Sequence, residues 1–118
     1  MTDVDHFERM LRARRTELED ELAALEERLA ALGAMRDANN DDEHDPDGAP
    51  VSAEWSRLTG IRREAERELS ATDAALSRVA DGSYGSCENC GRPIAPARLE
   101  ARPTALLCIE CAQRAARP

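Results

Sequence analysis

The chain has 118 residues, of which 34% are charged and only 3% aromatic, and its formal net charge is −8. With so few aromatic side chains we expect no compact core of ordinary size, so that stability must come from long helices and a bound metal ion. The acidity argues against non-specific DNA binding, which needs a basic face, and we expect no direct sequence-specific DNA binding. No apolar run reaches the eighteen or so residues of a membrane span.

A long first helix is predicted from Asp3 or Asp5, either of which can cap it, to about Ala38. Apolar residues recur along it at alternating steps of four and three, which is the spacing of a coiled-coil seam. The seam consists of Leu18, Leu22, Leu25, Leu29 and Leu32, is extended toward the N-terminus by Leu11, and has Phe7 and Met10 beside it. Such a helix, roughly 50 Å long at 1.5 Å per residue, predicts a coiled-coil arm.

The segment 39–53 interrupts this helix with asparagine, proline and glycine, the residues typical of turns. It is also strongly acidic, because residues 37–54 hold seven carboxylates and no arginine. Ser52 suits the N-cap of a second helix from about Ala53 to Ala80. The second seam is weaker, because Arg62 occupies one of its positions; its other members are Leu58, Ala65, Leu69, Thr72, Leu76 and Val79.

All four cysteines of the chain lie in two C-x-x-C pairs, Cys87 with Cys90 and Cys108 with Cys111. Each pair can turn both sulfurs toward one centre, and four thiolates suit tetrahedral zinc. Gly91 favours the tight turn after the first pair. The alternative, a redox pair, is expected beside a βαβ pattern that this sequence does not have. We therefore predict one structural zinc ion. Thiols kept for metal fit a reducing cytoplasm. The acidic N-terminus has no apolar stretch, so we expect no signal peptide.

Gly82 is expected to end the second helix, and Ile94, Leu99, Leu106, Leu107 and Ile109 to pack around the metal. The prolines at 93, 96 and 103 suggest only short strands or turns, and a short helix should begin at the second cysteine pair. The predicted fold is mainly α. Residues 1–81 form a long antiparallel coiled-coil hairpin with its acidic tip at 39–53, and residues 82–118 form a small four-cysteine zinc ribbon with a short C-terminal helix.

The residues around the cysteines resemble the signature of the DksA/TraR zinc-finger family: Gly82-x-Tyr84-Gly85-x-Cys87-x-x-Cys90-Gly91-x-x-Ile94, then Arg98-Leu99-x-Ala101-x-Pro103, then Cys108-x-x-Cys111. The resemblance implies a transcription regulator that binds RNA polymerase directly rather than DNA. The hairpin would enter the secondary channel of the polymerase and modulate initiation. The sequence contains no nucleophile–base pattern and no phosphate-binding glycine loop, so we expect no enzymatic activity.

The resemblance also assigns partner-binding carboxylates to the tip, namely Asp42, Glu43, Asp45 and Asp47. Active members of the family carry a D-x-x-D-x-A tip. Here Asp47 and Ala49 are in register with that pattern, but His44 stands at its first position. The alarmone ppGpp acts with many family members and is a possible ligand, but the basic residues that contact it cannot be matched in this chain.

Three other interpretations stay open. The chain could be a protein-interaction adaptor stabilised by zinc, or a stimulator of transcript cleavage by polymerase whose tip holds a second magnesium ion. The segment from Glu43 to Glu54, with Gly48 at its sixth position, also nearly matches a calcium-binding EF-hand loop. Two prolines inside that segment and the lack of a second such loop argue against calcium.

Overall fold

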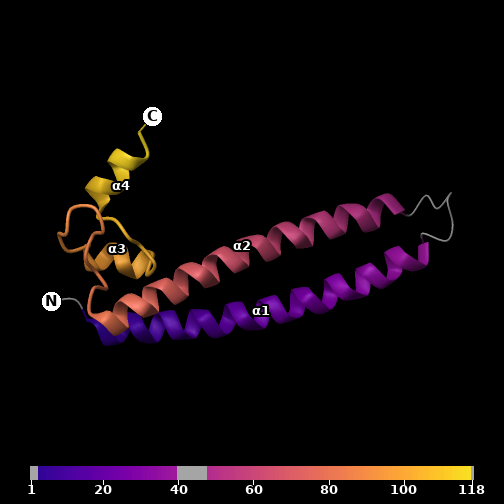
Figure 1. Ribbon diagram of the computed structural model, residues 1–118, viewed down its shortest axis with the longest axis horizontal. Coiled ribbons are helices and arrows are strands. Elements are labelled where there is room, and N and C mark those ends of the chain that lie inside the picture. The colour runs from indigo at the N-terminus through magenta and orange to yellow at the C-terminus, as the bar shows by residue number, and fades with distance from the viewer. Residues whose placement is uncertain (1–2, 40–47, 118) are drawn as a thin grey trace. The chain divides into compact units, whose positions relative to one another are not determined.

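The computed structural model describes residues 3–39 and 48–117. They form four helices, labelled in Figure 1: α1 (Val4–Asn39), α2 (Gly48–Asp81), α3 (Pro96–Ala101) and α4 (Ile109–Ala115). In this part of the chain the only β-type pairing is an isolated antiparallel bridge between Ser86 and Pro93. The fold is therefore mainly α, as predicted. None of the described helices is long and apolar enough to cross a membrane.

The chain divides into two compact units, and α1 and α2 contribute to both. Residues 17–69 form one unit, which we call the arm unit. Residues 1–16 together with 70–118 form the other, which we call the cysteine unit because it contains all four cysteines.

In the arm unit, α1 and α2 pack as an antiparallel pair. Glu26 on α1 faces Arg62 on α2, while Arg28, farther along α1, pairs with Glu54, which lies earlier on α2. The predicted seam forms the buried core, made of Leu25, Leu29 and Leu58 with Leu32, Trp55 and Ile61 packed against it. Because a heptad spacing keeps these leucines on one face of each helix, the two helices can bury them without a third element.

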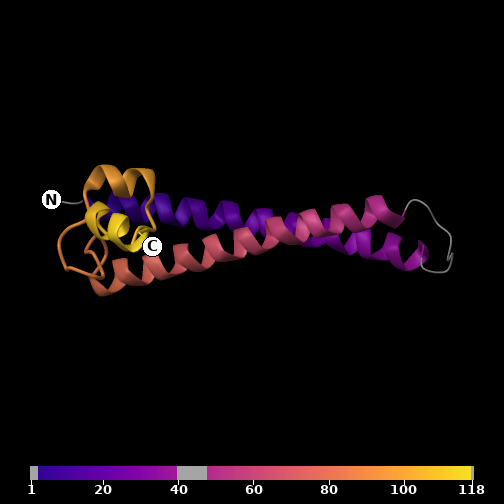
Figure 2. The same ribbon diagram turned by 90° about the horizontal axis from the view of Figure 1, so that it is seen from above.

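In the cysteine unit, the first turns of α1 and the last turns of α2 share one core with the segment that carries the cysteines. In both views α3 lies beside the first turns of α1 (Figures 1 and 2). An interaction between His6 Nε2 and Glu100 Oε2, 2.8 Å apart, joins these two helices. The buried core residues are Phe7, Leu11, Ala75, Tyr84, Cys87, Ile94, Leu99, Ala105, Cys108 and Cys111.

Two of the predicted helix ends are confirmed. The Oδ1 atom of Asp3 accepts a hydrogen bond from the backbone N–H of His6 at 3.1 Å, which is the contact of an N-cap residue. At the C-terminal end of α2, the helix stops at Asp81 and Gly82 follows with a φ of 85°. Glycine adopts this left-handed conformation without the steric cost that a Cβ would bring.

Two predictions about prolines are wrong. We expected the second helix to start near Ala53 with Ser52 as its cap, whereas α2 begins at Gly48. Pro50 thus lies in the first helical turn, where its missing N–H removes no intrahelical hydrogen bond. We also expected only strands or turns around Pro96, whereas Pro96 begins α3. Proline is well suited to the first helical position because its φ is already helical.

Arg62 confirms that the second seam is imperfect and provides a test of it. Its side chain is 31% exposed, and its nearest carboxylates, those of Glu26 and Glu66, are 3.8 and 3.7 Å away, which are loose ion pairs. Replacing it by leucine should add apolar burial at the cost of weak pairs, and should raise the free energy of unfolding by about 1 kcal/mol.

The measurement is the urea midpoint of Arg62→Leu beside Arg63→Leu, which changes an exposed residue on the same helix. The Arg63 variant should leave the midpoint unchanged. A lower midpoint for Arg62→Leu would show that the two ion pairs matter more to the arm than the apolar seam.

Candidate metal centre

The first cysteine pair sits on a tight turn between α2 and α3. The backbone N–H of Gly91 donates to the carbonyl oxygen of Cys87 at 2.9 Å, which closes the turn around Cys90. Gly91 has a φ of 76°, so the predicted need for glycine after this pair is confirmed. The N–H of Cys87 donates to the carbonyl of Arg92 at 2.8 Å and fixes the residues that follow the turn.

The second cysteine pair is held by the start of a helix. Cys108 is the N-cap residue of α4 and Cys111 lies in the first turn of that helix. The backbone N–H of Ala112 donates to the carbonyl of Cys108 at 2.9 Å. A helical turn places residues three apart on the same face, so both sulfurs of this pair point to one side.

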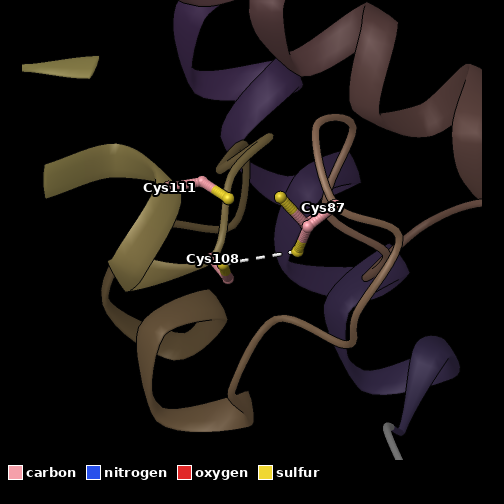
Figure 3. Close-up of side chains that lie close together, drawn as sticks. Cys87, Cys108 and Cys111 are labelled. Carbon is pink, nitrogen blue, oxygen red and sulfur yellow. Dashed lines mark hydrogen bonds between the residues drawn. The ribbon is translucent and has the colours of Figure 1, made fainter. Parts of the chain in front are cut away.

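The four sulfurs meet at one point, as the sequence predicted. They all lie within 4.8 Å of one another, and the Sγ atoms of Cys90 and Cys108 are 3.8 Å apart. A tetrahedral zinc ion with Zn–S bonds of about 2.3 Å would hold its sulfurs roughly 3.8 Å apart. Figure 3 shows the side chains of Cys87, Cys108 and Cys111 turned toward this shared centre. All four cysteines are free thiols, so the arrangement fits a structural zinc ion.

The surroundings of the sulfurs give the four thiols unequal acidity. The backbone N–H of Cys108, followed by that of Cys90, donates to the sulfur of Cys87 and lowers its pKa to about 6. A hydrogen bond from Asn89 lowers the pKa of Cys111, but the other three thiols and burial together outweigh it and raise this pKa to about 11. Zinc must therefore displace protons from the cluster, and its affinity should fall in acid.

Asn89 contacts both cysteine pairs, and the sequence analysis missed it. It lies between Cys87 and Cys90, yet its Nδ2 donates to the sulfur of Cys111 at 3.3 Å. Its backbone N–H also donates to Cys87 and contributes to the lowered pKa of that thiol. A polar donor inside a C-x-x-C pair is the signal that could have identified it, because residues around metal ligands often donate to them.

Two other members of the sequence signature, Tyr84 and Arg98, hold the chain around the cysteines. The hydroxyl of Tyr84 donates to the carbonyl of Pro103 at 2.7 Å, and burial raises the pKa of this tyrosine to about 12. The Nε of Arg98 donates to the carbonyl of Leu107 at 2.9 Å. Both bonds fix the segment that leads into Cys108, so these side chains serve the geometry of the site.

The four tip carboxylates that the sequence analysis assigned to partner binding, Asp42, Glu43, Asp45 and Asp47, lie outside the described residues. Glu54, the last position of the EF-hand interpretation, is described. Its two carboxylate oxygens accept hydrogen bonds from Arg57 and Arg28. Gly48, which would be the turn glycine of a calcium loop, is the first residue of α2 instead. The structure therefore argues against a calcium loop.

Comparison with known proteins points to one family. The family described as "Prokaryotic dksA/traR C4-type zinc finger" matches residues 82–117. The RNA polymerase-binding transcription factor DksA of Salmonella typhimurium is 38% identical over 109 residues, which cover 92% of this chain and 68% of that protein. The protein of the same name from Caulobacter vibrioides is 52% identical over 66 residues. That match covers 54% of this chain and only about half, 46%, of the relative.

Solved structures extend the similarity to the helices. The transcription factor DksA2 from Pseudomonas aeruginosa superposes with a TM-score of 0.81 and 30% identity, covering 95% of this chain and 81% of that one. The DnaK suppressor protein from Agrobacterium tumefaciens gives a TM-score of 0.59 and 32% identity, covering 97% of this chain and 95% of its own. The similarity thus includes α1 and α2 as well as the four-cysteine region.

The role of Asn89 is open to a direct test. Replacing it by alanine removes the donor to Cys111 without touching a ligand, and should weaken zinc binding by roughly ten- to a hundredfold, as losses of outer partners of metal ligands typically do. Zinc affinity is measured by competition with a chromogenic chelator at pH 7. The matched control is Glu88→Ala, in the same C-x-x-C pair, which should bind zinc like the wild type. Equal affinities for all three proteins would contradict the role given to Asn89.

Proposed function

The chain belongs to the DksA/TraR family of C4-type zinc-finger proteins, and we propose that it regulates transcription by binding RNA polymerase directly. The main support is the similarity to the Salmonella protein, which this chain matches over 109 residues. The name of that protein states that it binds RNA polymerase. The antiparallel helices of the arm unit and the four-cysteine cluster both fall within the regions that match. We place the protein in the cytoplasm, where RNA polymerase acts.

In this proposal Cys87, Cys90, Cys108 and Cys111 hold one zinc ion. Four thiolates complete a tetrahedral shell, so the ion supplies folding free energy and leaves no open position for a substrate. Side chains around the cysteines hold the ligands and the neighbouring backbone in place. Asn89 donates to a ligand sulfur, while Tyr84 and Arg98 hold the segment before Cys108. We accordingly assign the chain a binding and regulatory role rather than an enzymatic one.

The contact with polymerase is assigned to the acidic segment that connects α1 to α2. We propose that Asp45 and Asp47, supported by Asp42 and Glu43, enter the secondary channel and modulate initiation. Carboxylates in a confined channel interact with magnesium or basic groups more strongly than they would in bulk water, because the effective dielectric constant is lower. A few such interactions suffice to shift the balance between polymerase conformations. The departure from the family's tip at His44 leaves the direction of regulation to experiment, and the same holds for any action of ppGpp.

The test is binding of the full-length zinc-loaded protein to core RNA polymerase, followed by the lifetime of promoter complexes. Wild type should bind at micromolar concentration and change that lifetime. The double variant Asp45→Asn/Asp47→Asn keeps the size of these two side chains but removes their charge, and should reduce the effect at least about fivefold. The control Asp20→Asn/Glu21→Gln removes two exposed carboxylates from α1 and should act like the wild type.

Each other interpretation predicts a different result. An interaction adaptor would not bind polymerase at micromolar concentration, and that outcome would overturn the proposal. A stimulator of transcript cleavage would accelerate cleavage in backtracked complexes in a way that depends on the tip carboxylates. If wild type and the tip variant changed promoter-complex lifetime equally, the assignment to Asp45 and Asp47 would be wrong although the binding itself would stand.

A further inference from the structure

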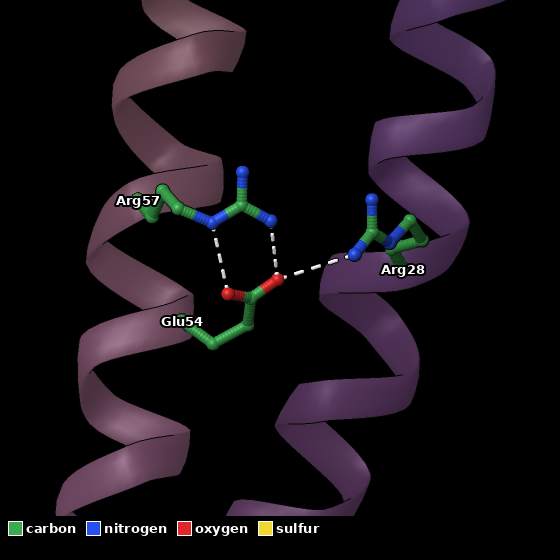
Figure 4. A network of polar contacts seen from close by, with 3 residues as sticks. All are labelled: Arg28, Glu54 and Arg57. Carbon is green, nitrogen blue, oxygen red and sulfur yellow. Dashed lines mark hydrogen bonds and ion pairs between the residues drawn. The ribbon is translucent and has the colours of Figure 1, made fainter.

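Within the arm unit, Glu54 joins the two helices through an ion-pair network. Arg57, three residues on along α2, donates to it twice, from Nε to Oε2 at 2.9 Å and from Nη2 to Oε1 at 2.6 Å. Arg28 reaches across from α1, and its Nη2 donates to the same Oε1 at 3.1 Å. Figure 4 shows the carboxylate between the two guanidinium groups. The hydrogen bond from Arg57 lowers the pKa of Glu54, which favours the charged carboxylate.

The next residue, Trp55, contacts α1 at a second place. A Cβ atom at Gly33 would lie 3.6 Å from ring atom Cζ3 of Trp55. The indole therefore packs against α1 at the position of this glycine. The guanidinium carbon of Arg36 lies 5.8 Å from the ring centroid, within the range of a cation–π contact. Glu54 and Trp55, adjacent on α2, thus hold α1 at two sites separated by one to two helical turns.

These contacts differ from the leucine seam in what they specify. The leucines recur along α1 at heptad positions, so the apolar seam alone discriminates less sharply between registers than a specific polar contact does. A carboxylate that pairs with one particular arginine, and an indole that packs over the small residue Gly33, each favour one register. They lie where α1 approaches its end at Asn39 and α2 has just begun at Gly48. The register therefore determines how the two helix ends that flank the acidic segment are placed.

We propose that these side chains form a register lock and act as positioning residues for polymerase binding; the lock consists of Arg28, Gly33, Arg36, Glu54 and Trp55. This inference rests on the proposed function. When the lock is open, α1 and α2 sample more than one register, and only part of the population presents its helix ends correctly. The apparent dissociation constant then rises in inverse proportion to that competent fraction, without the loss of any direct contact with polymerase.

The variants open the lock from the α1 side, so that Trp55, the only tryptophan of the chain, remains as a fluorescent reporter. Arg28→Gln removes the cross-helix donor to Glu54, and Arg36→Gln removes the cation from the indole. Gly33→Leu places a side chain where the ring packs. Gly33→Ala is its matched control, because the 3.6 Å separation is an ordinary contact that a methyl group can make.

A second control separates the cross-helix contact from ion pairing in general. Arg67→Gln removes a guanidinium that pairs with Glu64, three residues earlier on α2. Both side chains lie on one helix and are well exposed. The variant therefore removes an arginine charge, as Arg28→Gln does, without altering a contact recorded between α1 and α2.

Two quantities are measured on each zinc-loaded full-length variant: acrylamide quenching of Trp55 in the free protein, and the dissociation constant for core RNA polymerase. Far-ultraviolet circular dichroism confirms that helix content is unchanged. The three lock variants should show about twofold stronger quenching, and an apparent dissociation constant raised about three- to tenfold, as expected if the competent fraction falls to between one third and one tenth. Both controls should match the wild type in both measurements.

Three outcomes would overturn the inference. Stronger quenching with unchanged affinity would mean that the contacts only stabilise the arm. Weaker affinity with unchanged quenching would mean that the arginines touch polymerase themselves. If the wild type did not bind polymerase at all, the proposed function would fail with it, and the wild-type arm of the experiment identifies that case separately.

Discussion

The convergence of four sulfurs on one point is the constraint on which the cysteine unit depends. The core around them contains few large side chains, and three of its buried members are the cysteines themselves. Four thiols brought within 4.8 Å cannot all ionise together without a cation, because like charges at that distance repel strongly. A zinc ion reverses this balance, since it binds the thiolates and turns their proximity into folding free energy. The hydrogen bonds of Asn89, Tyr84 and Arg98 then keep the surrounding chain in the shape that the metal requires.

The arm unit has to fix the register of two helices without a third element. Its leucine seam buries apolar surface, but leucines that recur at heptad positions discriminate only weakly between registers. Glu54 and Trp55 add the specific contacts, one electrostatic and one of shape, at the end where the helices flank the acidic segment. This division between an apolar seam and a few polar determinants of register is a general device of coiled coils. In a protein proposed to act through a short acidic segment, control of the flanking helix ends is where such determinants have most effect.

Much of this structure follows from patterns in the sequence. The spacing of the cysteines predicted their cluster, and leucine steps of four and three predicted the core that Leu25, Leu29 and Leu58 form. The predictions that rested on Pro50 and Pro96 were wrong. A proline breaks a helix in its interior but is tolerated in the first turn, where both of these lie. Spacing alone does not say which of the two places a proline occupies. Asn89 and the Glu54 network escaped prediction because they depend on which residues of distant segments meet. That information appears only once the chain is folded.

The most direct measurement of the central claim is a photocrosslink from the arm to polymerase. A photoreactive amino acid at Ser52, an exposed position on α2 just after the acidic segment, is incubated with core RNA polymerase, and the attached residues are identified by mass spectrometry. Entry of the arm into the secondary channel predicts crosslinks to polymerase residues that line this channel, and fewer of them when unlabelled wild-type protein competes. Crosslinks only to other copies of this chain, or to polymerase surfaces away from that channel, would contradict it.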